Sequence, residues 1–174
     1  MITAKPDFAS VYEKYFSSIY NYVYAQLLHK ERTEDLVSEV FVKAMAHYGE
    51  YDPNKSQVQT WLTRIARNTL IDSYRKHDRT EILSLDEEGA DEPFFEEEYK
   101  ILDEPVYQEV HKLLRKLTES ERELLTMIYF QDMKNPEIAE VLGINPKAVS
   151  ERHRRLLEKC RRLERGTDIR SILE

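Results

Sequence analysis

Residues 135–163 read NPEIAEVLGINPKAVSERHRRLLEKCRRL, and this stretch decides the fold of the C-terminal half of the chain. Asn135 is a good N-cap, and the proline after it suits the first position of a helix. Gly143 ends that short helix, and Asn145 with a second proline repeats the start signal for a helix to about Leu163. A short helix, a glycine-containing turn and a second helix are typical of a helix-turn-helix.

The second of these helices is strongly basic, with eight Lys and Arg against three Glu in residues 147–165. A recognition helix lies in the major groove with its first turns against base edges. Arginine can pair with guanine, and a carboxylate can accept from cytosine. A solvated basic helix at the end of a bundle is the alternative, which the two capped helices around a tight turn disfavour. The residues predicted to contact duplex DNA are Lys147, Ser150, Glu151, Arg152, Arg154 and Arg155.

Two more helices are predicted before this pair. Thr118 followed by Glu121 is a capping box, which starts one of them. The other covers residues 105–117, where apolar side chains recur at three and four positions. Residues 105–165 therefore form one helical domain, and residues 166–174 are a tail to which we assign no role.

An acidic stretch separates this domain from the N-terminal part of the chain. Residues 81–104 hold eleven acidic side chains against one base, Lys100, and they also contain Gly89 and Pro93. The net charge of the chain is −7, so the remainder has a positive balance. The local sign of the charge bears on nucleic-acid binding more than the total does. We interpret the stretch as a linker between two domains.

The N-terminal domain, residues 1–80, is predicted to contain three helices. Apolar residues with helical spacing predict the first over residues 8–27. Thr33 is the expected N-cap of the second, because two acids follow it at the positive end of the helix dipole. The third is expected over residues 57–77, after the loop HYGEYDPNKSQ.

The second predicted helix has an apolar and a polar side. The polar side carries Asp35, Ser38 and Glu39, with Val42 beside them. This face can dock a basic partner helix or can be solvated, and the residues alone leave both interpretations open. The side chains predicted to face the core are Leu36, Val37, Val40, Phe41, Ala44 and Met45.

Aromatic and basic side chains interleave on the third predicted helix. Stacking of a base on an aromatic ring stabilises by about 1–3 kcal/mol, and positive charge follows the nucleic-acid backbone. The same aromatic residues are equally suited to be core anchors, so both interpretations stand. The residues predicted to contact melted DNA are Trp61, Arg64, Asn68 and Arg75, with Tyr51 from the preceding loop.

The composition points away from several other classes of protein. No apolar run of about 18 residues occurs, so we expect no membrane insertion. The one cysteine, Cys160, and the absence of a secretory signal favour a cytoplasmic protein. The histidines lack metal-ligand spacing, and no phosphate loop or nucleophile motif is found. We therefore expect no catalytic residue, no cofactor and no metal.

Three stretches in this order resemble the bacterial sigma factors, specifically the small extracytoplasmic-function (ECF) type. TEDLVSEVFVKA, residues 33–44, is similar to the family's most characteristic helix. WLTRIARNTLIDSYRK, residues 61–76, is similar to its promoter-melting helix, and residues 117–162 are similar to its C-terminal domain. The resemblance covers nearly the whole chain.

The resemblance implies an all-α fold with a sigma-2-like bundle, a linker and a sigma-4-like helix-turn-helix. It implies a transcription-initiation subunit whose partners are core RNA polymerase, promoter DNA and an anti-sigma factor. The face of Asp35, Ser38 and Glu39 would dock on the coiled coil of the largest polymerase subunit. The loop before Trp61, with Arg64 and Asn68, would hold a flipped-out base of the melted minus-10 element. The residues that would read the duplex minus-35 element are Lys147, Ser150, Glu151, Arg152 and Arg154.

Two other functions are compatible with parts of the sequence. A free-standing helix-turn-helix regulator would bind a duplex operator without polymerase, usually as a symmetric dimer, but no dimer seam is evident. An adaptor that binds only protein would use the acidic face and the linker, and would leave the basic recognition helix without a role.

Overall fold

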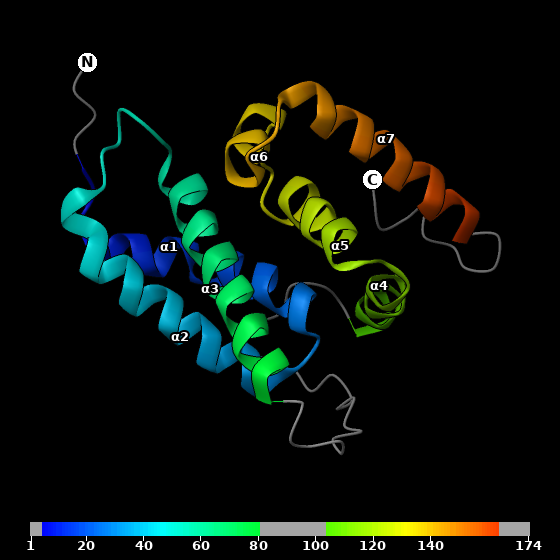
Figure 1. The fold of residues 1–174 in the computed structure, drawn as a ribbon, viewed down its shortest axis with the longest axis horizontal. Helices are drawn as coiled ribbons and strands as arrows, with labels where there is room; N and C mark the ends of the chain where they lie inside the picture. The colour runs from blue at the N-terminus through cyan, green and yellow to red at the C-terminus, as the bar shows by residue number, and fades with distance from the viewer. Residues whose placement is uncertain (1–4, 81–103, 164–174) are drawn as a thin grey trace. The chain divides into compact units, whose positions relative to one another are not determined.

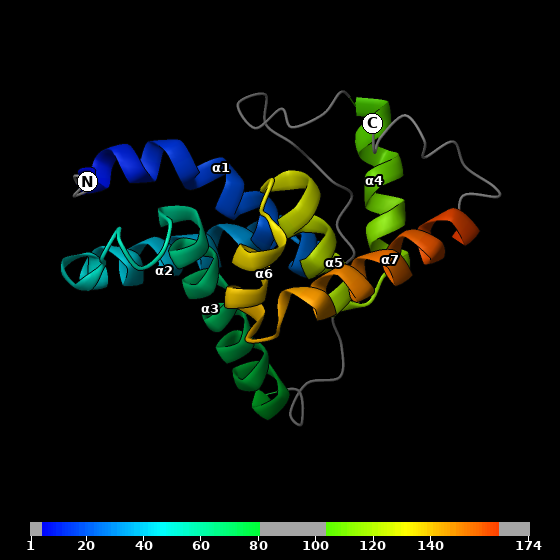
Figure 2. The same cartoon turned by 90° about the horizontal axis from the view of Figure 1, so that it is seen from above.

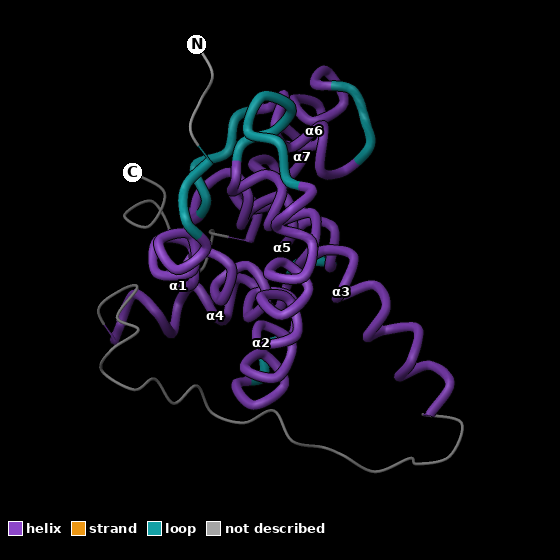
Figure 3. Tube along the Cα trace, turned by 90° about the vertical axis from the view of Figure 1, so that its left-hand side faces the viewer, coloured by secondary structure: helices purple, strands orange, loops and turns teal. Residues whose placement is uncertain are grey.

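The computed structural model describes residues 5–80 and 104–163. Within these two stretches every regular element is helical and no strand is present (Figure 3). The all-α prediction is therefore confirmed. The predicted tail and almost all of the predicted linker lie outside the described residues.

The chain divides into two compact units, residues 1–94 and 95–174. The division falls inside the acidic stretch, in agreement with the predicted two-domain organisation.

The N-terminal unit is a bundle of three helices, α1 (Phe8–Leu27), α2 (Lys30–His47) and α3 (Val58–Thr80), which pack against one another in every pairing (Figure 1). A 3-10 turn, Tyr48–Glu50, follows α2. The apolar sides of all three helices meet in one core, as their periodicity predicts. The buried side chains at its centre are Val11, Ile19, Val23, Val37, Val40, Phe41, Ala44, Leu62, Ala66 and Leu70.

The start of α2 differs from the prediction. The N-cap is His29, whose Nδ1 accepts from the backbone N–H of Arg32 at 3.4 Å, and the prediction of Thr33 is wrong. Thr33 lies one turn inside the helix and is fully buried. Its hydroxyl donates to the carbonyl of His29 at 2.8 Å, so it stabilises the first turn from within.

The C-terminal unit contains α4 (Glu104–Lys116), α5 (Glu119–Leu125), α6 (Asn135–Leu142) and α7 (Pro146–Leu163). A single π-turn, Thr126–Phe130, continues α5. Helix α7 packs against both α6 and α5, and Figure 2 shows the first of these pairs from above. The buried side chains of this unit include Leu113, Leu117, Leu124, Met127, Ile138, Ala139, Val149, Leu156 and Cys160.

The predicted caps of this unit are confirmed in two of three cases. Thr118 and Glu121 form the expected capping box at the start of α5. Asn145 caps α7, because its Oδ1 accepts from the N–H of Ala148 at 2.8 Å. The prediction of Asn135 is wrong: Lys134 is the N-cap of α6, and Asn135 is already helical. The carboxylate of Glu137 accepts from the Lys134 N–H at 2.7 Å and takes over part of the capping.

The turn between α6 and α7 depends on Gly143. Its backbone is left-handed, with φ of +66°, and its N–H donates to the carbonyl of Ala139. The N–H of Ile144 donates to the same carbonyl at 3.1 Å. These two bonds satisfy the end of α6 and reverse the chain within three residues, which sets the direction in which α7 starts.

Replacement of Gly143 by alanine tests this dependence. An added Cβ meets no atom within 4 Å at Gly143, so only the left-handed backbone opposes it. We expect Gly143→Ala to lower the free energy of unfolding by about 1–2 kcal/mol, measured by urea denaturation. Gly49→Ala is the matched control, because its Cβ also meets open space and its φ is not left-handed. Equal unfolding midpoints for the two variants would contradict the assignment.

Candidate nucleic-acid interfaces and docking face

The outward side of α3 carries the residues predicted to contact melted DNA. Trp61, Arg64, Asn68 and Arg75 follow one another at three-, four- and seven-residue spacing, so they share one side of the helix. Asn68 and Arg75 are exposed, and Trp61 and Arg64 are half-buried. Arg75 lies 3.8 Å from the carboxylate of Asp72, an exposed pair that contributes little. The helix therefore offers polar and aromatic groups together on its exposed side.

An aromatic cluster lies at the N-terminal end of this side. The ring of Trp61 lies 4.9 Å from that of Tyr51 and 5.9 Å from that of Tyr48, measured between centroids. Tyr48 and Tyr51 stack at 5.8 Å with nearly parallel planes. The loop after α2 and the first turn of α3 are thus joined by three rings.

Tyr51 is held under this cluster and is only 7% exposed. Its hydroxyl donates to the carbonyl of Ser56 at 2.9 Å, and burial, with Tyr48 nearby, raises its pKa. Tyr51 is thus mostly covered by its own loop, while Trp61 keeps a partly accessible ring, and the predicted contact of Tyr51 with melted DNA stays a prediction.

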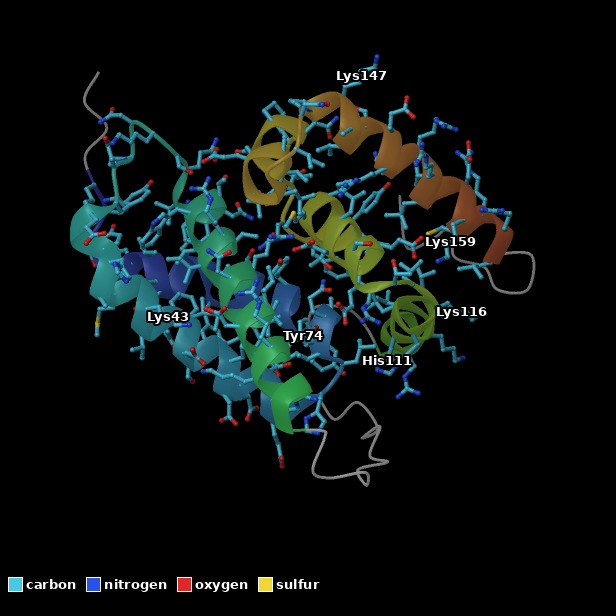
Figure 4. The ribbon with its side chains drawn as sticks, viewed as in Figure 1. Lys43, Tyr74, His111, Lys116, Lys147 and Lys159 are labelled. Atoms are coloured by element: carbon cyan, nitrogen blue, oxygen red, sulfur yellow. The ribbon has the colours of Figure 1, made fainter. Side chains whose placement is uncertain are left out.

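The first turns of α7 expose every residue that the sequence analysis selected there. Lys147 stands at the start of the helix and points away from it (Figure 4). On the opposite side, Val149, Leu156 and Cys160 are buried against the rest of the unit. The exposed residues are Lys147, Ser150, Glu151, Arg152, Arg154 and Arg155.

These exposed residues differ in whether their charges are already paired within the protein. Arg154 bonds to Glu158 at 2.6 Å and lies 3.6 Å from Glu151. Within residues 110–163, by contrast, Lys147, Arg152 and Arg155 form no ion pair. Among the exposed residues at the start of α7, Lys147, Arg152 and Arg155 are therefore the cations most available to an external anion.

Three polar contacts hold α7 in place from outside the core. The Ser150 hydroxyl accepts from Asn135 Nδ2 at 2.8 Å and donates to the carbonyl of Pro146 at 3.2 Å. His153 Nε2 lies 3.0 Å from the hydroxyl of Tyr129. Lys159 pairs with Glu121 at 2.5 Å, so the residue that caps α5 also anchors α7. These contacts fix the angle at which the basic side is presented.

The exposed side of α2 is acidic at one end and apolar at the other. Asp35, Ser38 and Glu39 are exposed as predicted, and Glu39 pairs with Lys43 at 2.7 Å. Lys43, labelled in Figure 4, also donates to Thr69 of α3 at 3.3 Å. We call Asp35, Ser38, Glu39, Val42 and Met45 the α2 face.

Met45 was predicted to be buried, and this prediction is wrong. Val42 is 62% exposed and Met45 is 61% exposed, although both are large apolar residues. Residues 35, 38, 42 and 45 are separated by three or four positions, so they form one stripe. The spacing predicts an exposed Met45, whereas its apolar character predicts a buried one, and the spacing is the correct signal. Adjacent exposed apolar side chains mark a surface that a partner can cover.

The described residues contain neither a metal site nor a membrane span. No cluster of three or more His, Cys, Asp or Glu in them could hold a metal ion. None of their helices has the length and apolar character to cross a bilayer. Cys160 is buried in the core of the C-terminal unit.

The fold and these surfaces define a class of protein: a two-domain helical DNA-binding protein whose C-terminal domain is a helix-turn-helix. Family models match both domains separately. Residues 11–80 match the model described as "Sigma-70 region 2", and residues 107–160 match "Sigma-70, region 4". The chain belongs to the ECF type of RNA polymerase sigma factors, and its function is promoter recognition and transcription initiation.

Individual relatives agree with this family. The chain is 30% identical over 141 residues to the ECF RNA polymerase sigma factor SigM of Bacillus subtilis, an alignment that covers 78% of this chain and 81% of SigM. It is 27% identical over 157 residues to the ECF RNA polymerase sigma factor BldN of Streptomyces coelicolor. That alignment covers 90% of this chain but only 60% of BldN.

Solved structures show the same fold. The sigma factor RpoE in complex with the anti-sigma factor NepR from Bartonella quintana superposes with a TM-score of 0.75 at 20% identity, over 92% of this chain and 98% of that one. CnrH in complex with the cytosolic domain of CnrY superposes with a TM-score of 0.66 at 23% identity, over 92% of this chain and 89% of that one.

The burial of His153 predicts a dependence of stability on pH. Burial lowers the pKa of His153, so the folded protein resists a proton that the unfolded chain accepts below pH 6.5. The free energy of unfolding should therefore fall between pH 7.5 and pH 5.5. His153→Gln removes this proton linkage and can still bond to Tyr129, so its urea midpoint should fall less over that interval. The remaining fall is expected from His111, whose pKa is also lowered by burial. An equal fall in both proteins would contradict the prediction.

Proposed function

We propose that the two units divide promoter recognition, the C-terminal unit reading duplex DNA and the N-terminal unit engaging polymerase and the opened strand. The observation that carries this proposal is that two separate DNA-compatible surfaces, on α7 and α3, lie within the two segments that match different sigma-70 regions.

The duplex minus-35 element would lie against the first turns of α7. Asn145 caps this helix, so its N-terminus is well formed where it would enter the groove. Arg152 and Arg155 are free to pair with guanine or phosphate. Arg154 must exchange its contact with Glu158 for DNA, so we assign it a smaller part. Lys147 and Ser150 would contact the backbone at the helix start, and Glu151 would accept from a base.

The melted minus-10 element would lie along the outward side of α3. The partly exposed ring of Trp61 offers a stacking surface, and Arg64, Asn68 and Arg75 extend from it along the helix. Opening duplex DNA requires about 1.4 kcal/mol per base-pair step on average, and one captured base returns about 1–3 kcal/mol. Capture of one or two bases cannot open several pairs, so opening depends on polymerase as well.

Core RNA polymerase would be bound by the α2 face. Its acidic half suits a basic helix of the partner, and the exposed side chains of Val42 and Met45 would be covered in the same contact. Desolvation of these two side chains adds affinity that charge alone does not provide. The acidic chain, with a net charge of −7, is then brought to DNA as a subunit.

This function makes the chain a regulatory subunit that acts in the cytoplasm and has no catalytic site. It disfavours the free-standing regulator, which would need its own means of binding DNA tightly. The two solved structures with this fold contain anti-sigma partners, NepR and the cytosolic domain of CnrY. We therefore include a protein inhibitor of this class among the partners of this chain.

The docking role predicts the effect of charge reversal on the α2 face. Asp35→Lys should lower the affinity for core polymerase by about tenfold, because it places a cation against a basic surface. Met45→Ser should lower it as well, through lost apolar contact. Glu13→Lys makes the same change of charge on an exposed part of α1 and serves as control. The measurement is competition for core polymerase, and equal affinities for Asp35→Lys and Glu13→Lys would refute the assignment.

The division of labour predicts different defects in the two units. With core polymerase and a cognate promoter, Arg152→Ala should weaken initial binding by about tenfold and reduce the salt dependence by about one ion. Asn68→Ala should leave initial binding nearly unchanged and slow strand opening. Gel-shift titration measures the first effect, and permanganate reactivity of unpaired thymines measures the second. Each variant is the control for the other, and loss of opening without loss of binding in Arg152→Ala would reverse the roles.

A further inference from the structure

The residues just before α1 lie against the end of α2. Lys5 Nζ donates to the carbonyl of Tyr48 and, at 3.4 Å, to that of Gly49. In return, the Tyr48 hydroxyl donates to the carbonyl of Pro6 at 2.5 Å. The ring of Phe8 meets that of Tyr48 edge-on at 5.1 Å. We call residues 5–8 the N-terminal clamp.

The position of Lys5 has an electrostatic reason. The last carbonyls of a helix lack partners and carry the negative end of its dipole. Helix α2 has one basic residue in its last turn, His47, which lies 3.5 Å from the carboxylate of Glu50. Lys5 brings a full positive charge to the carbonyls just beyond, although it is more than forty residues away in the sequence. The Tyr48 carbonyl also accepts from the backbone N–H of Tyr51 at 3.2 Å, so Lys5 adds a positive charge to a group that already has a local hydrogen bond.

Tyr48 is the centre of these contacts. The ammonium of Lys5 lies 4.3 Å from the centroid of its ring and 5.7 Å from that of Tyr51. The other neighbours of Tyr48 are Phe8, Tyr51 and Trp61. The clamp therefore fixes the ring against which Trp61 rests, and with it the entrance to the loop between α2 and α3.

We propose that the N-terminal clamp positions Tyr48 and Trp61 for capture of the unpaired promoter base, and that Lys5 is a positioning residue for strand opening. This inference rests on the proposed function of α3. Lys5 acts through Tyr48 and need not touch DNA itself. Because Lys5 is exposed, its contribution to overall stability is small. Removal of the Lys5 charge is expected to change the geometry of the loop between α2 and α3.

The position of the cluster can be measured without DNA, since Trp61 is the single tryptophan of the chain. Lys5→Met keeps the length of the side chain and removes its charge. We expect it to change the emission of Trp61 in the full chain, and we expect Lys5→Arg to keep the wild-type emission. Lys14→Met is the control, because Lys14 also lies over a tyrosine ring, that of Tyr15 at 5.2 Å, outside the clamp.

The consequence for opening is measured with core polymerase and a cognate promoter. Lys5→Met should slow opening by about two- to fivefold, the range expected for one exposed cation–π contact, with initial binding unchanged. Lys5→Arg should restore the rate, and Lys14→Met should match the wild type. Slower opening with altered Trp61 emission supports the inference.

Two outcomes would overturn the inference, and they can be told apart. If Asn68→Ala slows opening while Lys5→Met opens promoters at the wild-type rate, the clamp has no part in capture and the proposed function stands. If Asn68→Ala also opens promoters normally, the proposed function of α3 has failed, and the inference fails with it.

Discussion

The functional surfaces of this protein depend on how the free backbone groups at helix ends are satisfied. Each helix leaves four N–H groups at its start and four carbonyls at its end without partners. Asn145 accepts from the first turn of α7, and the bonds around Gly143 close the end of α6. Lys5 supplies the cation beyond the end of α2. Where these groups are satisfied, the direction of the next segment is set, and the α7 surface and the aromatic cluster at the start of α3 begin at these places.

The same arrangement explains how an acidic chain can present a surface for DNA. The core takes the apolar side of each helix, so the outward sides are free to differ in charge. Helix α7 exposes cations that the protein leaves unpaired, whereas Arg154 is already bound to a carboxylate. The α2 face exposes acids next to Val42 and Met45. Opposite charges on different helices would let one chain attract both a nucleic acid and, as proposed for the α2 face, a basic protein surface.

The sequence was sufficient for features that depend on local spacing. The spacing of apolar residues predicted the three helices of the N-terminal unit. Capping and turn residues predicted the capping box at Thr118 and the glycine turn at Gly143. Thr33 and Asn135 were misassigned as caps, because a cap requires a backbone conformation that composition does not reveal. His29 and Lys134 have the extended conformation instead. The predicted residue roles in polymerase and DNA contact stay predictions.

Long-range contacts were beyond the reach of the sequence. Tyr51 is buried because its hydroxyl donates to the carbonyl of Ser56 and its ring packs against Trp61. The spacing of apolar residues in the sequence does not predict these contacts. Lys5 contacts the end of α2 only because α1 and α2 pack side by side.

The energy scale of the proposed base capture accounts for the many contacts around the loop before α3. Fixing the backbone of one residue costs about 1–2 kcal/mol, which is as much as a stacked base returns. A loop that became ordered only on meeting DNA would use up all the energy of capture. In this chain Asp52 accepts from the N–H and the side-chain amide of Asn54 at 2.9 and 3.0 Å, and its carbonyl accepts from Lys55 at 3.1 Å. With Tyr51 and Tyr48 held as well, the loop is ordered before DNA arrives. Under the proposed function, the binding energy of each captured base then remains available for strand opening.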